Sequence, residues 1–157
     1  MQQSNYTVVV ISISNPILIG IYRNKKLVEN ISKEGKTSDI LPLLFDNILS
    51  KYNVENILYV NGPGSYMAIK IAYIFLKTIS IVKNIRLYAV SGFDFNKNSP
   101  IKALGKKYFF REKKGSEDKI SIKFLEENNI EEFSLPESLH DINYSDNILP
   151  EYNLPAV

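Results

Sequence analysis

Hydrophobic and polar positions at the start of the chain follow a pattern typical of strands. β-Branched residues dominate Tyr6–Ser14 (YTVVVISIS), which predicts a buried strand. Asn15-Pro16 breaks this segment, and two further strands are predicted over Ile17–Tyr22 and, with more exposure, over Leu27–Ser32. Because Asn24-Lys25 suits a tight turn, the chain is predicted to open with an antiparallel meander.

Apolar residues then recur at helical spacing in two segments, and each of these is followed by a strand. The side-chain oxygens of Thr37, Ser38 and Asp39 are candidate N-caps for the first helix, with Pro42 in its first turn. Strands alternating with helices after a meander predict an α/β fold, a mixed sheet with flanking helices. The predicted helices cover 37–52 and 65–83, and the strands cover 56–60 and 85–90.

The composition becomes polar over 91–99 (SGFDFNKNS), where we place a boundary between an N-terminal subdomain, 1–95, and a smaller C-terminal one, 96–157. Beyond it, Ile101–Arg111 predicts strand, turn and strand, and Lys113–Lys119 predicts a charged turn. Ile120–Glu126 fits either a strand or a short helix. The tail from Leu135 holds several prolines and is predicted to be irregular.

The second predicted helix is more apolar than a helix with one solvent-exposed face needs to be. Between 66 and 82 the exceptions are two lysines, a threonine and a serine, whereas a helix on a sheet requires an apolar stripe of little more than 100°. The surplus lies on two flanks, one with Ile69, Tyr73 and Leu76 and the other with Met67, Ile74 and Ile81. We therefore predict that the helix docks against a partner protein, and the sequence leaves the flank open. The alternative is that the second lobe of the chain covers the surplus.

A pair of small residues in the second helix and the apolar residues of the first helix also favour docking. Ala68 and Ala72 form a small-xxx-small pair that permits close backbone approach. The first helix has a similar apolar excess, so the two helices could form half of a four-helix bundle. Charge introduced by Ala72→Glu or Leu76→Arg is expected to break the complex and leave the fold intact. The candidate interface residues are Leu41, Leu44, Phe45, Met67, Ala68, Ile69, Ala72, Tyr73 and Leu76.

The amino-acid composition excludes several classes of catalytic and binding function. The 157 residues contain no Cys, which excludes disulfides, thiol nucleophiles and thiolate metal sites, and the single His140 lies in the tail without partners for a catalytic triad. The net charge of +2 is too small to argue for nucleic-acid binding by electrostatics alone. The start has no basic, cleavable apolar segment, and no apolar run of about 18 residues predicts a membrane span. We expect a cytoplasmic protein without catalytic or metal-binding residues.

Some local motifs allow a second interpretation. The loop 62–65 (GPGS) before the second helix could hold an anion, but no phosphate-loop lysine follows and Pro63 removes a donor, so a structural turn is favoured. Ser12 and Ser14 end the first strand where a metal-nucleotide site would need Asp. The basic, aromatic segment 102–114 could contact a phosphate backbone, but a charged edge hairpin is favoured.

Several short segments of the sequence resemble motifs of the TsaB (also called YeaZ) family. The opening VVVISIS–NPILIGIY resembles that family's first hairpin, usually written with IDTS, and 36–44 (KTSDILPLL) is similar to its HSExLLP stretch. The segment 57–72 (ILYVNGPGSYMAIKIA) resembles its distinctive GPGSFTGLRIG word after a strand. The segment IRLYAVSGF resembles the family's strand ending in VSSL. Two further segments, KALGKKYFF and ILPEYNLPAV, resemble family segments more weakly. The resemblance covers the first 95 residues well and the rest loosely.

This resemblance implies a degenerate actin/Hsp70-like (ASKHA, ribonuclease H-like) fold with a reduced second lobe and no cofactor. It implies a non-catalytic subunit that homodimerises or pairs with the catalytic paralogue TsaD, together with the ATPase TsaE. That bacterial complex adds a threonylcarbamoyl group to the tRNA adenosine next to the anticodon, so tRNA is reached through the complex. The rival hypotheses are a stand-alone homodimeric scaffold, a nucleotide-binding enzyme of the same superfold, and a peptidase.

The sequence also departs from the family pattern. The family's first-strand Asp is Ser12 here, and its His-Ser pair in the first helix aligns with Lys36 and Thr37. In the GPGS stretch, its Thr, Gly and Arg correspond to Met67, Ala68 and Lys70. These changes weaken any residual metal or nucleotide role.

Overall fold

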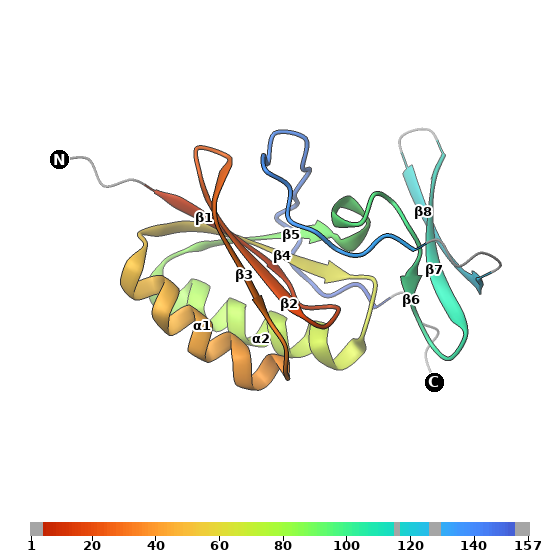
Figure 1. The fold of residues 1–157 in the computed structure, drawn as a ribbon, viewed down its shortest axis with the longest axis horizontal. Helices are drawn as coiled ribbons and strands as arrows, with labels where there is room; N and C mark the ends of the chain where they lie inside the picture. Colours follow the sequence, from red (N-terminus) through yellow and green to blue (C-terminus); the bar gives the residue numbers. More distant parts are fainter. Residues whose placement is uncertain (1–4, 115–116, 126–129, 153–157) are drawn as a thin grey trace.

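The computed structural model describes residues 5–114, 117–125 and 130–152, which form two sheets and a layer of two helices (Figure 1). The larger sheet has five strands in the order β3-β2-β1-β4-β5, and the smaller has three in the order β6-β7-β8. The larger sheet is built from β1 (Tyr6–Ile11), β2 (Ile17–Arg23), β3 (Lys26–Lys33), β4 (Val54–Gly62) and β5 (Arg86–Ser91). The predicted mixed sheet with an opening meander is confirmed.

The meander forms because the turn chemistry and the strand pattern agree. Asn24 and Lys25 both adopt positive φ, 50° and 64°, as the tightest hairpin turns require. Strand β1 pairs antiparallel with β2 and parallel with β4, and its residues Val8–Ile11 are fully buried. Strand β1 therefore lies at the centre of the sheet with both faces covered, which accounts for its unbroken run of β-branched residues.

Both helices pack on one face of the larger sheet (Figure 1). Helix α1 (Thr37–Lys51) connects β3 to β4, and α2 (Tyr66–Lys83) connects β4 to β5. The main core fills the space between sheet and helices. Its buried members include Val8, Val10, Ile19, Ile21, Ile57 and Tyr59 from the strands and Ile40, Leu41, Phe45, Ile48, Ala72 and Leu76 from the helices.

The helix N-termini differ from the prediction. Lys36, and not Thr37, Ser38 or Asp39, is the N-cap of α1, and no side chain makes a capping hydrogen bond there. Pro42 lies inside the helix, one turn beyond its start. Ser65 is the N-cap of α2 as predicted, but its side chain makes no capping bond either. Both helices therefore begin without the side-chain cap that the sequence predicts.

The tail covers the other face of the sheet and both of its edges. Beside β3, the Leu27 amide donates to the Glu137 carbonyl at 2.9 Å. Beside β5, Ala89 and Ser145 exchange backbone hydrogen bonds of 2.8 and 2.9 Å. Leu139 packs between these contacts in a second core on this face. The irregular tail thus satisfies backbone groups that edge strands otherwise leave open to pairing.

The second lobe consists of β6 (Ile101–Lys102), β7 (Lys107–Lys114) and β8 (Glu117–Phe124). The predicted charged turn at Lys113–Lys119 is too long, because β7 and β8 extend into it and pair antiparallel, with Lys113 opposite Asp118. The segment Ile120–Glu126, left open between strand and helix, is a strand through Phe124. Its end at Glu126 lies outside the described residues. The tail beyond this lobe returns to the larger sheet.

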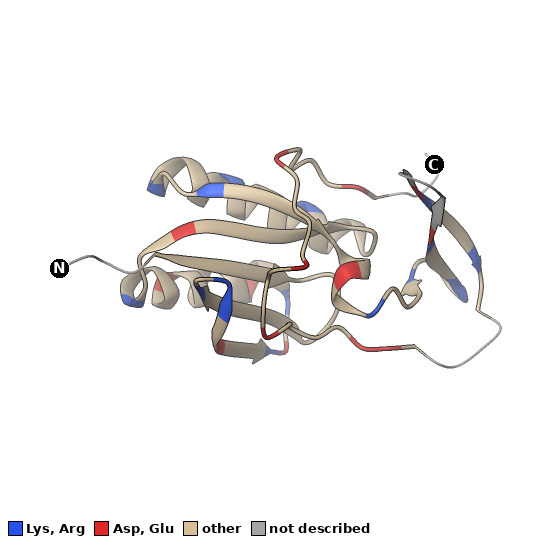
Figure 2. Cartoon of the chain, turned by 90° about the horizontal axis from the view of Figure 1, so that it is seen from above, with Lys and Arg blue, Asp and Glu red and all other residues tan. Residues whose placement is uncertain are grey.

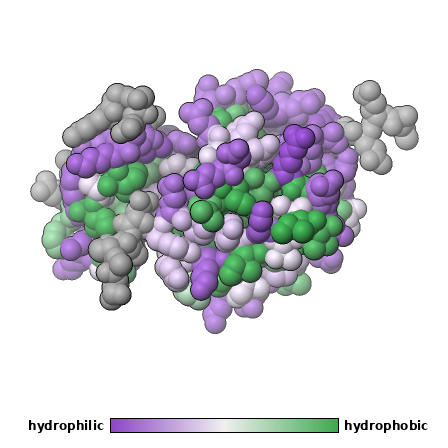
Figure 3. All heavy atoms as spheres, turned by 180° about the vertical axis from the view of Figure 1, so that it is seen from behind, coloured by the Kyte–Doolittle hydropathy of each residue, from purple (hydrophilic) through white to green (hydrophobic). Residues whose placement is uncertain are grey.

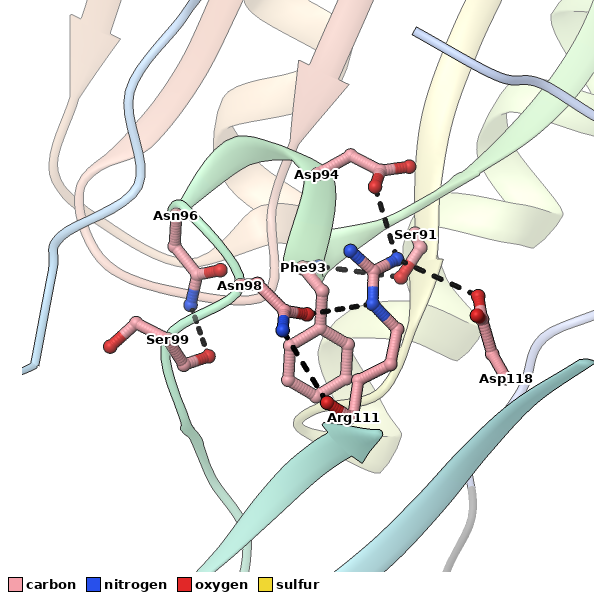
Figure 4. Close-up of polar contacts among 8 residues, drawn as sticks. All are labelled: Ser91, Phe93, Asp94, Asn96, Asn98, Ser99, Arg111 and Asp118. Carbon is pink, nitrogen blue, oxygen red and sulfur yellow. Dashed lines mark hydrogen bonds and ion pairs between the residues drawn. The ribbon is translucent and has the colours of Figure 1, made fainter. Parts of the chain in front are cut away.

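Arg111 fastens the second lobe to the first (Figure 4). Its side chain extends from β7 and is 6% exposed, and its Nη1 lies 3.0 Å from the Asp94 carboxylate in η1 (Gly92–Phe95). Its Nε donates to Asn98 at 2.7 Å, and the guanidinium lies 5.2 Å from the centre of the Phe93 ring. Because its side chain is paired within the protein, Arg111 does not contribute a free positive charge to the basic segment 102–114.

Charges of both signs are spread over the two lobes (Figure 2). Among the described residues, no helix combines the length and the hydropathy that crossing a membrane requires.

Candidate docking surface on the helix layer

The orientation of α2 decides which of its apolar flanks faces outward. Ile69, Ala72 and Leu76 are fully buried against the sheet, at 0% exposure. On the opposite side Met67 is 58% exposed, Ile74 54% and Ile81 68%. Figure 3, which views the molecule from behind, shows hydrophobic side chains gathered over the helix layer of the larger lobe. The surplus predicted from the sequence is therefore present, on the flank that contains Met67.

The exposed flank has a regular spacing, and we call it the outer stripe: Met67, Ile71, Ile74, Thr78 and Ile81. Ile71 is half-buried and Thr78 is exposed. The steps between neighbours alternate between four and three residues, the spacing that keeps a seam facing a second helix. The Thr78 hydroxyl donates to the Ile74 carbonyl at 2.8 Å. Because that donor is satisfied inside the helix, Thr78 brings no unpaired donor to the stripe.

A shallow groove of about 270 Å³ runs beside the outer stripe, between the two helices. It is lined by Pro42 and the start of α1 on one side and by Ile71, Ile74 and Phe75 on the other. Phe75 contacts Phe45 edge-on at 5.7 Å between ring centres, which holds the two helices together below the groove. The groove and the stripe together present apolar surface that a protruding side chain could fill.

The tail covers the other side of α2. The Tyr59 hydroxyl donates to the Ile148 carbonyl, and burial raises the pKa of Tyr59. The Tyr66 ring lies 4.4 Å from that of Tyr152. The alternative that the second lobe covers the surplus is thus corrected in part: the tail, and not β6–β8, covers the flank with Tyr73, whose ring lies 6.3 Å from that of Tyr59. It does not hold for the outer stripe as far as the described residues extend.

Most of the predicted interface residues lie inside the protein, which corrects the predicted surface. Leu41, Phe45, Ile69, Ala72 and Leu76 are all at 0% exposure because they pack between the sheet and the helices. A partner cannot reach these side chains without opening the core. Likewise Ala72→Glu and Leu76→Arg would place charge in the core, so these changes do not leave the fold intact.

The remaining predicted interface residues lie nearer the surface. Leu44, Ala68 and Tyr73 are half-buried, and Met67 is exposed in the outer stripe. The prediction omitted Ile71, Ile74, Thr78 and Ile81 from the interface. A signal was present in the seven-residue repeat of apolar side chains at 67, 74 and 81.

The fold is shared with a class of solved proteins. No protein-family model matches the sequence, and no curated protein is similar to it in sequence. YeaZ from Pseudomonas aeruginosa superposes with a TM-score of 0.56 at 12% identity, over 77% of this chain and 67% of YeaZ. An uncharacterised protein described as similar to the peptidase YeaZ from Pseudomonas aeruginosa matches at a TM-score of 0.53 and 10% identity, over 97% and 69%. The predicted YeaZ-like fold is confirmed.

Proposed function

We propose that this chain is a divergent, non-catalytic TsaB-like subunit that binds a TsaD-like catalytic protein through the outer stripe. One observation carries the proposal: α2 fills the core with one face and exposes Met67, Ile74 and Ile81 on the other. The YeaZ-like fold and the sequence segments that resemble the TsaB family support this proposal.

Burial of the outer stripe would supply the driving force for docking. Complete burial of a large apolar side chain is worth roughly 1.5–3 kcal/mol, so burying the exposed halves of three such residues contributes roughly 1 kcal/mol each. Alternating steps of four and three residues suit a partner helix that crosses at a shallow angle. With α1 beside α2, two partner helices would complete a four-helix arrangement.

In this proposal the subunit supports an assembly that modifies tRNA. The bacterial complex adds threonylcarbamoyl to the adenosine next to the anticodon, with a TsaE-like ATPase as a further partner, in the cytoplasm. The chain would reach tRNA through its partners. Its low net charge and the internal pairing of Arg111 with Asp94 support an indirect role.

Copurification with a coexpressed TsaD-like protein tests the proposal. Ile74→Arg introduces charge at the centre of the outer stripe and is expected to abolish copurification, because the docked guanidinium would lose water without gaining a partner. Asn30→Arg adds the same side chain at an exposed position of β3, outside both helices, and is the matched control, expected to copurify normally. Equal recovery of Ile74→Arg and the wild type would rule out this surface as the docking site.

The same stripe also favours a second candidate function, a stand-alone homodimeric scaffold. A helix seam can pair with its own copy about a two-fold axis. Light scattering on the isolated chain separates the two: a dimer that Ile74→Arg converts to a monomer supports the scaffold. A monomer that binds only the TsaD-like protein supports the subunit.

A further inference from the structure

A pocket of about 190 Å³ lies on the face of the larger sheet that the tail covers. Figure 1 shows both helices on the opposite face. Thr7, Asn56 and Arg86 lie opposite one another in the registers of β1, β4 and β5 and form a polar row across the floor of the pocket. Leu58 and Tyr88 form an apolar row beside it. The lining is completed by Lys25 of the β2–β3 turn and by Leu139 and Tyr144 of the tail.

The polar row lies at the edge of the sheet where the parallel strands begin. Thr7, Asn56 and Arg86 each fall within the first three residues of their strands. Ser12 and the loop 62–65, the places considered for a nucleotide or an anion from the sequence, lie at the opposite ends of β1 and β4. The pocket is therefore separate from those places in both the face and the edge of the sheet that it occupies.

The tail closes this pocket from above the sheet. The Leu139 amide donates to the Lys25 carbonyl at 2.9 Å, and Ser145 is held to Ala89 of β5 by the backbone hydrogen bonds already described. Near the second anchor, the Tyr144 ring contacts the Tyr88 ring edge-on at 4.8 Å between centres. Because backbone hydrogen bonds hold both ends of the segment 139–145, the fold itself builds the apolar and aromatic wall of the pocket.

The charges at the pocket are all positive. Lys25 and Arg86 are the two charged residues of the lining, and no carboxylate lines it. They approach from opposite sides, because Lys25 is in the β2–β3 turn and Arg86 is on β5, with β1 and β4 between them.

The polar side chains of the pocket are also unused within the protein. Among the described residues, neither Lys25 nor Arg86 makes an ion pair, and the side chains of Thr7 and Asn56 make no hydrogen bond. Two cations, a hydroxyl and an amide can all donate hydrogen bonds to one ligand. A pocket with these donors and without a carboxylate favours an anion.

We propose that this pocket binds a small organic phosphate. A phosphate monoester carries a charge of about −1.5 to −2 and three terminal oxygens, which matches two cations and the neutral donors of the polar row. The planar guanidinium of Arg86 is suited to bind two of these oxygens at once. The rings of Tyr88 and Tyr144, with Leu139, would contact the organic part.

The size of the pocket limits the ligand. A volume of about 190 Å³ corresponds to about six water molecules, so the part of the ligand that enters is small. The inference is independent of the proposed function, because it involves only this chain and the face of the sheet away from the outer stripe.

Amide NMR of the isolated chain, titrated with phenyl phosphate and separately with inorganic phosphate at constant pH and ionic strength, tests the proposal. We expect saturable shifts of the Thr7, Asn56 and Arg86 amides, with phenyl phosphate binding at least about threefold more tightly than inorganic phosphate. Arg86→Gln removes one of the two cations and should weaken phenyl phosphate binding at least about fivefold. Arg23→Gln removes the same charge from an exposed position outside the lining and is the matched control, which should bind as the wild type does.

Tyr144→Ala removes an aromatic wall and should abolish the preference for phenyl phosphate while it leaves the binding of inorganic phosphate unchanged. If this change loosens the tail, the exposed Arg86→Gln and Arg23→Gln pair decides the matter by itself. Absence of saturable shifts, or shifts confined to other parts of the chain, would overturn the proposal. Equal losses for the two arginine variants would also overturn it, because they would indicate non-specific attraction.

Equal affinity of the wild type for the two phosphates would overturn the proposal as well, because no organic part would then be recognised. None of these results bears on docking at the outer stripe, which is measured with a partner protein.

Discussion

Two alanine substitutions on α2 should differ sharply in their effect on stability, although they delete almost the same atoms. Leu76 is at 0% exposure in the main core, whereas Ile74 is 54% exposed in the outer stripe. Leu76→Ala removes buried carbon atoms and leaves a cavity, which costs about 2–5 kcal/mol. Ile74→Ala loses roughly 1 kcal/mol of transfer free energy, because about half of the side chain is already in water. The better helix propensity of Ala offsets a few tenths of a kcal/mol of this loss.

Urea unfolding followed by far-UV circular dichroism measures both free energies of unfolding on the isolated chain. We expect the Leu76→Ala protein to unfold at clearly lower urea concentration and the Ile74→Ala protein to unfold close to the wild type. Comparable losses for the two variants, or a larger loss for Ile74→Ala, would refute the orientation of α2 on which the outer stripe depends. If Ile74→Ala also weakens partner binding while it leaves stability nearly unchanged, the docking role is separated from folding.

Three further predictions concern contacts that hold distant segments together. Asp94→Asn leaves the buried Arg111 guanidinium without its nearest carboxylate and should lower the free energy of unfolding by roughly 1–3 kcal/mol, measured in urea. A hydrogen bond from Lys51 is the main cause that lowers the pKa of Glu29 below 4.5. The stability from this charged carboxylate is therefore present above pH 4.5 and lost as pH falls through the lowered pKa, so the difference in melting temperature between wild type and Glu29→Gln should vanish in acid. Tyr22→Phe removes a 2.6 Å hydrogen bond to the tail and should cost about 1 kcal/mol, measured by thermal unfolding.

Each of these predictions has an outcome that contradicts it. Asp118 lies 3.9 Å from Arg111 and its side chain is 48% exposed, so Asp118→Asn should be nearly neutral, and an equal loss for both aspartates would contradict the assigned pairing. A Glu29→Gln difference that persists unchanged in acid would show that the carboxylate charge is not its source. If Tyr22→Phe is as stable as the wild type, the tail is held to the sheet by its other contacts alone.

Local sequence determined the elements of this protein. Tyr6–Ser14 predicts a buried strand because β-branched side chains suit a sheet, and Asn24-Lys25 predicts a hairpin because Asn tolerates positive φ. The apolar surplus of α2 was also visible, because it depends only on residue type and spacing. Each of these features is decided by interactions within a few residues, so the sequence is sufficient to predict them.

Tertiary structure decided what those elements face. Two stripes of α2, one through Ile69 and Leu76 and one through Met67 and Ile74, are almost equally apolar, and only packing on the sheet determined which one is exposed. The pairing of Arg111 with Asp94 and the return of the tail to β5 also join residues far apart in the chain. Such contacts depend on where the whole backbone places each segment. The periodicity of a helix specifies that a surplus face exists, but the direction of that face is set by the rest of the fold.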